Sequence, residues 1–457
     1  MSFDSLIFIL YFLPLTLFMY YISKAKYRNL ILLITSIFFY IWGASQTIVI
    51  IFISIVFNYS FGYLLDKFEK HKKTILYLGI SFNIIILIYY KYTNFFIMNY
   101  NKVTDSNHEL LKLLIPLGIS YITFQQISYI VDIYRKTVIF ENNFINYSLY
   151  VIFFPKIIAG PITKYSLINE NIKHREYNDN LFKEGIFRFS LGLGKKVLIS
   201  NVLSIVANKI FAIDPHLLGF NISLLGMITY TLQIYFDFSG YTDMAIGIAK
   251  MFSINLPENF DKPYKSKGFI DFWRRWHITL SSFLRDYIYI PLGGNRVSKN
   301  RLIFNTFILF LISGFWHGAS FTFIVWGIYH GFFVIIEKLG ANKLYKILPS
   351  FISELITFLL VAVGWVFFRA DSLRYALNYI FALIDPRKIV PLSNLDIGID
   401  NKFWFIFILS LIIVFMPKIK ENKTFLVISK IFSIIILIYS IAVITTGSFM
   451  PFIYLKF

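Results

Sequence analysis

Cysteine is absent from this chain of 457 residues. Its absence excludes disulfides, thiolate metal sites and any mechanism that stores an acyl group on a protein thiol. Charged residues are also scarce, at 15% of the chain, against roughly 25% in an average soluble protein. Hydrophobic residues make up 57% and aromatic residues 20%, and this composition excludes a soluble globular enzyme.

Acidic residues are few relative to basic ones. Lys and Arg number 44 against 25 Asp and Glu, which gives a formal net charge of +19. The positive charges lie between long apolar stretches, so the excess does not by itself indicate nucleic-acid binding. Instead it resembles the basic cytoplasmic loops of membrane proteins. Internal repeats, low-complexity linkers and a separate soluble stretch are all lacking, so residues 1–457 are predicted to form a single integral membrane domain.

Two uninterrupted segments predict pairs of membrane helices. Residues 29–65 carry no charge over 37 positions, and one straight helix of that length would reach about 55 Å, nearly twice a hydrocarbon core of about 30 Å. We therefore expect a break at residues 43–46, where Gly-Ala-Ser-Gln interrupts the apolar run. Residues 302–336 lack Asp, Glu, Lys and Arg and predict a second pair, broken near residues 318–320.

Further apolar runs raise the expected number of crossings to about 11, on a need of roughly 17 to 25 residues each. The fold class is thus an all-α polytopic membrane protein with added re-entrant or interfacial helices. The first run follows Asp4 without a basic leader and is predicted to be a retained helix. The loops around residues 24–28 and 67–73 are basic, which predicts that they are cytoplasmic and that the N-terminus lies outside.

Residues that carry chemistry concentrate between about 230 and 331. Asp237 and Asp243 lie in an apolar context, and ionisable groups at membrane depth are candidates for a functional site. The Ser-Gly pair at 239–240 predicts a helix break between them. An alternative stays open, in which both carboxylates pair with Lys or Arg elsewhere and only hold helices together.

The segment 271–294 predicts an interfacial or re-entrant helix. At helical spacing Trp273, His277 and Leu284 fall on one stripe. The basic residues of this region suit the phosphates of an anionic donor such as coenzyme A, or equally lipid headgroups. They are Lys262, Lys265, Lys267, Arg274, Arg275 and Arg285.

His317 lies in the middle of the second long apolar pair, between Gly314 and Gly318. A neutral imidazole there can accept a proton from a hydroxyl nucleophile. Membrane histidines also hydrogen-bond neighbouring helices, so a structural role stays open. His330, on the next helix, is interpreted as such a packing residue.

Five blocks in this order, YFDFSGYTDMAIG, LPENFDKPY, DFWRRWHITLSSFLRDYIYIPLGGN, SGFWHG and WGIYHG, resemble the membrane-bound O-acyltransferase family. The closest likeness is to its bacterial branch, which serves O-acetylation of alginate or peptidoglycan. Supporting matches lie at 154–162, 194–196 and 364–369. The ending 452–457 resembles the aromatic tail of that branch, although Leu455 and Lys456 stand where Phe and Gln are expected.

The resemblance implies a ring of tilted helices around a central tunnel in a bacterial cytoplasmic membrane. His317 matches the histidine regarded as catalytic, and His277 matches a second important histidine. The donor would be a cytoplasmic thioester such as acetyl-CoA, with no bound cofactor or metal. The acceptor would be an extracytoplasmic polysaccharide, served by a separate SGNH-type transferase. A sister group transfers D-alanine to teichoic acid instead.

The residues are consistent with direct attack. Without cysteine or a Ser-His-Asp triad in view, the simplest mechanism uses His317 as general base on a hydroxyl that attacks the thioester. The substrate-binding candidates are Asp237, Tyr241, Asp243, Trp273, Arg274, Arg275, Arg285 and Trp316. Two other classes stay open: a glycan or lipid transporter, although the two matching halves of many transporters are not visible, and a non-catalytic scaffold.

Overall fold

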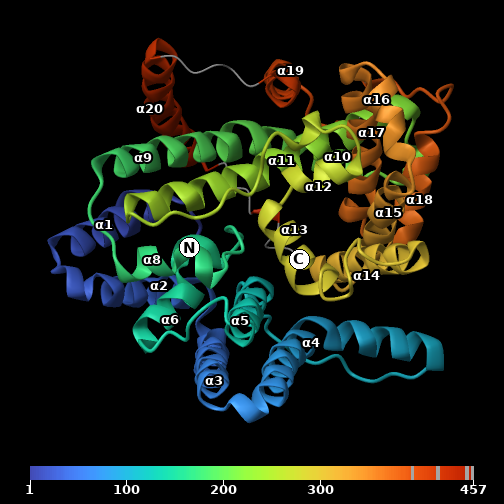
Figure 1. Cartoon of the computed structure of the whole chain (residues 1–457). Coiled ribbons are helices and arrows are strands. Elements are labelled where there is room, and N and C mark those ends of the chain that lie inside the picture. The colour runs from blue at the N-terminus through green and yellow to red at the C-terminus, as the bar shows by residue number, and fades with distance from the viewer. Residues whose placement is uncertain (393–395, 418–422, 448–451, 454–457) are drawn as a thin grey trace. The chain divides into compact units, whose positions relative to one another are not determined.

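A computed structural model describes residues 1–392, 396–417, 423–447 and 452–453. Its described residues form helices and connecting loops, with no strand among them (Figure 1). The chain divides into two compact units, residues 1–189 with 241–258 and residues 190–240 with 259–457. The all-helical architecture expected from the sequence is confirmed.

The first unit contains the helices up to most of α9. They are α1 (Leu13–Ile22) after a π-helical turn (Phe8–Phe12), α2 (Arg28–Ala44), α3 (Ile48–Lys67), α4 (Lys72–Thr104), α5 (Ile119–Tyr134), α6 (Phe144–Ile152), α7 (Phe154–Ile157), α8 (Tyr165–Lys173) and α9 (Asp179–Gly194). The expected break at residues 43–46 is confirmed, because α2 ends at Ala44 and a short 3-10 turn precedes α3.

Helices α3, α4 and α5 pack side by side in this unit (Figure 1). Their contact includes buried amides: Asn83 Nδ2 donates to Asn58 Oδ1 at 2.6 Å, and Ser54 Oγ donates to Gln126 Oε1 at 2.7 Å. Polar side chains that pair across helices are a usual means of joining helices in a membrane.

The second unit contains the remaining helices. They are the π-helical segment Lys195–Ser200, α10 (Asn201–Phe211), α11 (Phe220–Met251, which returns to the first unit after Gly240), α12 (Phe269–Arg275), α13 (Ile278–Leu284), a second π-helical segment (Arg285–Tyr289), α14 (Lys299–His317), α15 (Phe321–Lys338), α16 (Leu344–Ile347), α17 (Ser350–Arg369), α18 (Leu373–Ala382), α19 (Asn401–Phe415) and α20 (Lys423–Thr445). Short 3-10 turns connect several of them.

Six helical stretches of the described residues are long and apolar enough to cross a membrane. They are Ala25–Lys67, Glu69–Thr104, Asp179–Ile210, Phe321–Lys338, Ser350–Arg369 and Val427–Thr445, and two shorter apolar helices are Phe8–Ile22 and Asn401–Phe415. A multi-pass protein is confirmed. The six stretches are fewer than the expected 11 crossings for two reasons. Ala25–Lys67 contains two helices, α2 and α3, and several other apolar runs form shorter helices, such as α5 with 16 residues and α6 with nine.

The helix break expected at Ser239-Gly240 is wrong, because α11 continues unbroken from Phe220 to Met251. Gly240 has a packing role instead. A Cβ at this position would lie 2.8 Å from the carbonyl oxygen of Gly192. Small residues allow such close helix contacts in membranes, so this glycine permits close packing and does not terminate the helix.

Helices α14 and α15 form a tight antiparallel hairpin. α14 ends at His317, Gly318 is extended and α15 begins at Phe321, so the break expected near residues 318–320 is confirmed. The two backbones touch through glycine: a Cβ at Gly327 would lie 2.3 Å from the carbonyl oxygen of Phe310. The hairpin therefore holds His317 rigidly at its turn.

The second unit has two ends that differ in charge. Lys338, at the end of α15, donates from Nζ to the Tyr289 hydroxyl at 2.7 Å, and Lys265 lies 3.7 Å from Glu354 near the start of α17. Residues 261–301, which include the start of α14, carry nine basic and three acidic residues. We call this the basic end.

The opposite end joins α10, α17 and the segment before α19. Arg369, the last residue of α17, donates to Asn208 Oδ1 at 3.2 Å, and Lys209 lies 3.4 Å from Asp396. Residues 369–400 carry four basic and four acidic residues. We call this the neutral end. Helix α15 starts at the neutral end and finishes at the basic end, so the hairpin turn after His317 lies towards the neutral end.

Candidate active site

His317 is surrounded by aromatic rings at the hairpin turn. Its ring centroid lies 4.9 Å from Trp316, 4.9 Å from Trp326 and 5.2 Å from Phe368, and 4% of the residue is exposed. Helices α14, α15 and α17 each supply one of these rings. The imidazole is thus held in a low-dielectric setting by three packed elements.

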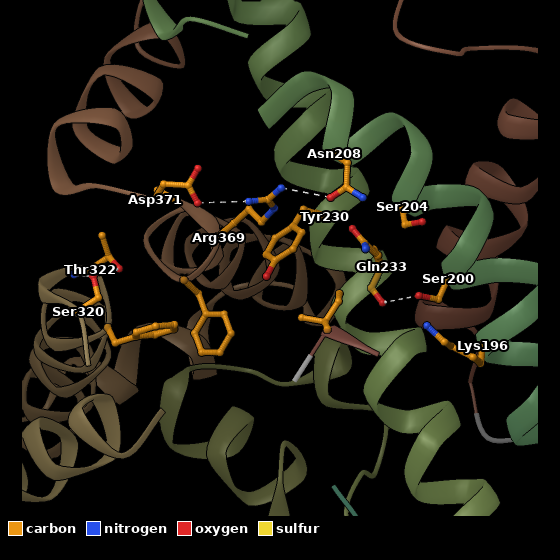
Figure 2. Close-up of a pocket in the computed structure, with 14 residues that line it drawn as sticks. Lys196, Ser200, Ser204, Asn208, Tyr230, Gln233, Ser320, Thr322, Arg369 and Asp371 are labelled. Atoms are coloured by element: carbon orange, nitrogen blue, oxygen red, sulfur yellow. Dashed lines mark hydrogen bonds and ion pairs between the residues drawn. The ribbon is translucent and has the colours of Figure 1, made fainter. Parts of the chain in front are cut away.

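A cavity of about 350 Å³ adjoins this cluster at the neutral end. Phe368 lines the cavity and also contacts His317, while Phe323 lines it and packs on Phe368 at 4.9 Å. The rest of the lining is mainly polar: Lys196, Ser200, Ser204, Asn208, Tyr230, Gln233, Ser320, Thr322, Arg369 and Asp371, with Ala370 and Ile453 (Figure 2).

Several polar groups of this lining are available to a ligand. The Tyr230 hydroxyl and Gln233 Oε1 are buried without a hydrogen-bonding partner among the described residues. Figure 2 shows Arg369 between Asn208 and Asp371, whose carboxylate lies 3.9 Å from the guanidinium. Because buried polar groups usually have partners, this lining suits a bound group that carries hydroxyls.

His277 lies at the junction of α12 and α13, not within one helix. Its backbone is left-handed, with φ of 43°, so the expected single stripe of Trp273, His277 and Leu284 is wrong. Asn259, 18 residues earlier in the chain, holds this kink: its Oδ1 accepts from His277 Nδ1 at 3.0 Å and from the Thr279 hydroxyl at 2.9 Å. The asparagine thereby fixes the turn and places the imidazole proton on Nδ1.

His277 is fully buried, and this burial lowers its pKa to about 3. Its ring lies 4.8 Å from Phe238 and 6.2 Å from Trp316. Trp316 in turn contacts His317. The two histidines predicted from the sequence therefore meet through one tryptophan, and His277 is neutral at physiological pH.

Asp237 pairs with Lys196 at 2.6 Å, and the two side chains are 1% and 4% exposed. Its second oxygen accepts from the backbone N–H of Ile453 at 2.8 Å. The interpretation that this carboxylate pairs with a cation is confirmed. The preceding residue, Phe452, packs on Phe238 at 6.1 Å, whereas residues 454–457 of the tail, with Leu455 and Lys456, lie outside the described residues.

Tyr241 and Asp243 belong to the first unit. Tyr241 stacks on Phe3 at 4.8 Å. Asp243 accepts from Arg188 Nε at 2.7 Å, and the same guanidinium binds both oxygens of Glu258 at 2.8 and 2.5 Å. The pairing interpretation is thus confirmed for this aspartate too, and their role in substrate binding stays a prediction.

The predicted arginines lie towards the surface of the second unit. Arg274 is exposed, Arg275 binds Asp271 at 2.9 Å, and Arg285 binds Asp286 at 2.7 Å. Trp273, by contrast, is 9% exposed and packs 5.7 Å from Trp326. Only the tryptophan therefore lies near His317, and the arginines contribute charge at the basic end.

Comparison with known proteins gives the same assignment. The model of the membrane-bound O-acyltransferase family matches residues 139–344. "Probable alginate O-acetylase AlgI" of Pseudomonas aeruginosa is 41% identical over 384 residues, which cover 82% of this chain and 73% of that protein. The chain belongs to the membrane-bound O-acyltransferase family. "Peptidoglycan O-acetyltransferase" of Helicobacter pylori is 38% identical over 420 residues, covering 84% and 79%.

A more distant relative has a different name. "Teichoic acid D-alanyltransferase" of Bacillus subtilis is 34% identical over 292 residues, which cover 59% of this chain and 72% of that protein. Membership in the membrane-bound O-acyltransferase family makes this chain a multi-pass membrane enzyme of the acyltransferase class. Among the described residues, no three His, Asp or Glu side chains gather as a metal site.

The residues that line the cavity were not predicted as a site. A signal for them exists: Ser200, Ser204 and Asn208 recur every fourth residue, which places them on one face of a helix. Tyr230 and Gln233 lie one turn apart on α11 in the same way. These polar stripes were not recognised as a site because each residue type by itself is common in membrane helices.

The buried neutral His277 should make stability depend on pH. The unfolded chain binds a proton at this imidazole below about pH 6.5, whereas the folded protein excludes it down to a pKa of about 3. The free energy of unfolding should therefore fall by about 1.4 kcal/mol per pH unit below that pH. Thermal unfolding at pH 7 and pH 5 measures this.

The variant His277→Asn is the control, because asparagine tolerates the left-handed backbone and does not titrate. Its melting temperature should decline less between pH 7 and pH 5 than that of the unmodified protein. Equal declines would show that the imidazole takes up its proton readily in the folded state.

Proposed function

We propose that this acyltransferase moves an acetyl group from acetyl-CoA at the cytoplasmic face to a hydroxyl on the other side of the bacterial cytoplasmic membrane. The product is O-acetylation of an extracytoplasmic polysaccharide, either alginate-like or peptidoglycan. The observation that carries the proposal is the position of His317 beside a polar cavity at the neutral end. The names of the two long-coverage relatives support the acetyl group and the polysaccharide.

The proposed reaction needs one general base. His317 takes the proton of the acceptor hydroxyl, whose oxygen attacks the thioester carbonyl and forms the C–O bond. The C–S bond then breaks, and the imidazolium returns its proton to the leaving thiolate. His277 acts as the second histidine of the site, and Trp316 lies in contact with both rings.

The charge of the two ends supports the direction of transfer. Basic loops are usually retained in the cytoplasm, which supports an orientation with the basic end at that face and the cavity at the outer face. Arg274, Arg275 and Arg285 would then attract the phosphates of the donor before it reaches the buried site. Lipid headgroups can occupy the same charges. Separately, the basic loops around residues 24–28 and 67–73 support an N-terminus on the outside.

In the proposed function the acetyl group has to reach a polysaccharide on the outer side of the membrane. The cavity has a volume of about 350 Å³ and is lined by hydroxyl and amide side chains, which supports the binding of a hydroxyl-bearing group there. The resemblance to the acetylating branch of the family supports an extracytoplasmic SGNH-type transferase as the partner that completes delivery to the polysaccharide.

D-Alanyl transfer to teichoic acid is the second candidate, favoured by one relative of that name. That relative covers 59% of this chain against 82% and 84% for the two acetylating relatives. The acetyl donor is therefore the better supported. The transporter and scaffold alternatives predict no transfer from either donor.

Inside-out membrane vesicles test the proposal. Radiolabelled acetyl-CoA added outside such vesicles reaches the cytoplasmic face of the protein, and we expect protected label in the lumen that mild base releases as acetate. Vesicles lacking the protein are the control. Label transferred equally in both preparations, or transfer from a D-alanyl thioester alone, would contradict the proposal.

A further inference from the structure

Three buried nitrogen-bearing rings meet beside His317, further along α15 than the residues that line the cavity. The ring centroids of Trp273, Trp326 and His330 are 5.7, 5.3 and 4.8 Å apart pairwise. Trp326 and His330 are 0% exposed and Trp273 is 9% exposed. We call these three residues the indole–imidazole triangle.

The polar atoms of the triangle lack partners among the described residues. These atoms are Nε1 of Trp273, Nε1 of Trp326 and both ring nitrogens of His330. Buried polar groups in folded proteins are nearly always hydrogen-bonded, and each exception calls for an explanation. Three such side chains, with their rings in contact, indicate a site where a ligand supplies the missing hydrogen-bonding partners.

The position of the triangle relative to His317 decides which substrate it serves. Trp326 contacts His317 at 4.9 Å, and His330 lies one helical turn further along α15 towards Lys338 at the basic end. The cavity lies at the other end, where α15 begins. The triangle therefore lies between His317 and the basic end of α15, the end from which the donor arrives in the proposed function.

We propose that the indole–imidazole triangle binds the acyl donor, with the indole N–H groups of Trp273 and Trp326 directed at the thioester carbonyl oxygen. This inference rests on the proposed function and names the residues that hold its donor. His330 completes the set, because a neutral imidazole offers one donor and one acceptor. The acceptor suits an amide N–H such as the one that follows the sulfur in a pantetheine thioester.

The chemistry assigns a catalytic contribution to the two indoles. Attack of the hydroxyl oxygen moves the carbonyl electron pair onto its oxygen, and N–H donors in a dry site stabilise that negative charge. The charge returns when the C–S bond breaks. Removing one such donor lowers the rate by about 10² to 10³ in other enzymes, and a loss of that order is expected here.

Trp365 provides a matched control. It stacks on Trp326 at 5.8 Å in the same aromatic cluster and is 1% exposed. Its Nε1 donates to the Tyr264 hydroxyl at 3.1 Å, so it already has a partner. Trp365→Phe and Trp326→Phe therefore remove the same atoms from the same cluster, but only the second removes an unpartnered N–H.

The experiment measures acetyl transfer by the full-length protein in inside-out vesicles, for the wild type, Trp326→Phe, Trp273→Phe and Trp365→Phe. Two unreactive donor analogues, S-acetonyl-coenzyme A and S-propyl-coenzyme A, are tested as inhibitors. They have equal chain length, and only the first carries a carbonyl oxygen. The ratio of the two inhibition constants therefore measures how much the contact with the carbonyl oxygen contributes to binding.

We expect the wild type and Trp365→Phe to prefer the acetonyl analogue at least tenfold. In Trp326→Phe and Trp273→Phe that preference should disappear, and kcat/KM for acetyl-CoA should fall by about 100-fold. A preference unchanged in both variants, or lost equally in Trp365→Phe, would overturn the inference while leaving the proposed function intact. Absence of transfer by the wild type would instead refute the proposed function and with it the inference.

Discussion

Replacement of His317 by alanine should abolish O-acetylation while leaving the protein folded in the membrane. The hairpin that carries the imidazole is held by close backbone contacts at Gly314 and Gly327, which the substitution leaves in place. Loss of a general base costs about 10² to 10⁴ in rate. The measurement is acetate per polysaccharide mass, normalised to the amount of protein in the membrane.

His216→Ala is the matched control for this change. His216 is an exposed histidine of the second unit, at the neutral end, where its carbonyl oxygen accepts from Lys388. Its replacement should leave acetylation at the level of the wild type. Normal acetylation by a well-expressed His317→Ala variant would refute the role of this histidine and favour the scaffold or transporter alternative.

Breaking the buried ion pair should have the largest effect on stability. In Asp237→Ala the cation of Lys196 remains without its carboxylate, and the backbone N–H of Ile453 loses its acceptor. Removing one partner of a buried pair typically costs about 3–5 kcal/mol. We expect a clearly lowered melting temperature of the purified protein in detergent.

The double variant Asp237→Leu with Lys196→Met separates charge from shape. Replacing both ions by apolar residues of similar size is often close to neutral, so the double variant should recover much of the lost melting temperature. Asp371→Ala serves as the surface control, since its side chain is 94% exposed and 3.9 Å from Arg369. Equal melting temperatures for Asp237→Ala and Asp371→Ala would show that the buried Asp237–Lys196 pair stabilises the fold no more than the exposed Asp371 does.

The parts of the fold that follow from chain-local chemistry were predicted from the sequence. An uncharged run longer than a bilayer must turn back, and the turns occur after Ala44 and after His317 as expected. The position of His317 at the hairpin turn was also predicted, because flanking glycines mark that turn, whereas the catalytic roles of His317 and His277 stay predictions. Both predictions rest on residues that are close together in the sequence.

The errors arise where packing decides. The sequence around Gly240 predicts a helix break. In the structure the carbonyl of Gly192 packs closely against Gly240, and α11 continues through it. His277 reads as part of one helical stripe, yet Asn259, 18 residues earlier, holds its backbone in a left-handed turn. The cavity was missed for the same reason, since its lining comes from four separate helical regions.

The most direct test of the account is base-releasable acetate on purified envelope and exopolysaccharide fractions. Cells with the wild-type protein, without it, and with His317→Ala are compared. Acetate on one fraction should fall equally in the null strain and the variant. Unchanged acetate on every fraction in the null strain would contradict this prediction and direct the search to D-alanylation or transport.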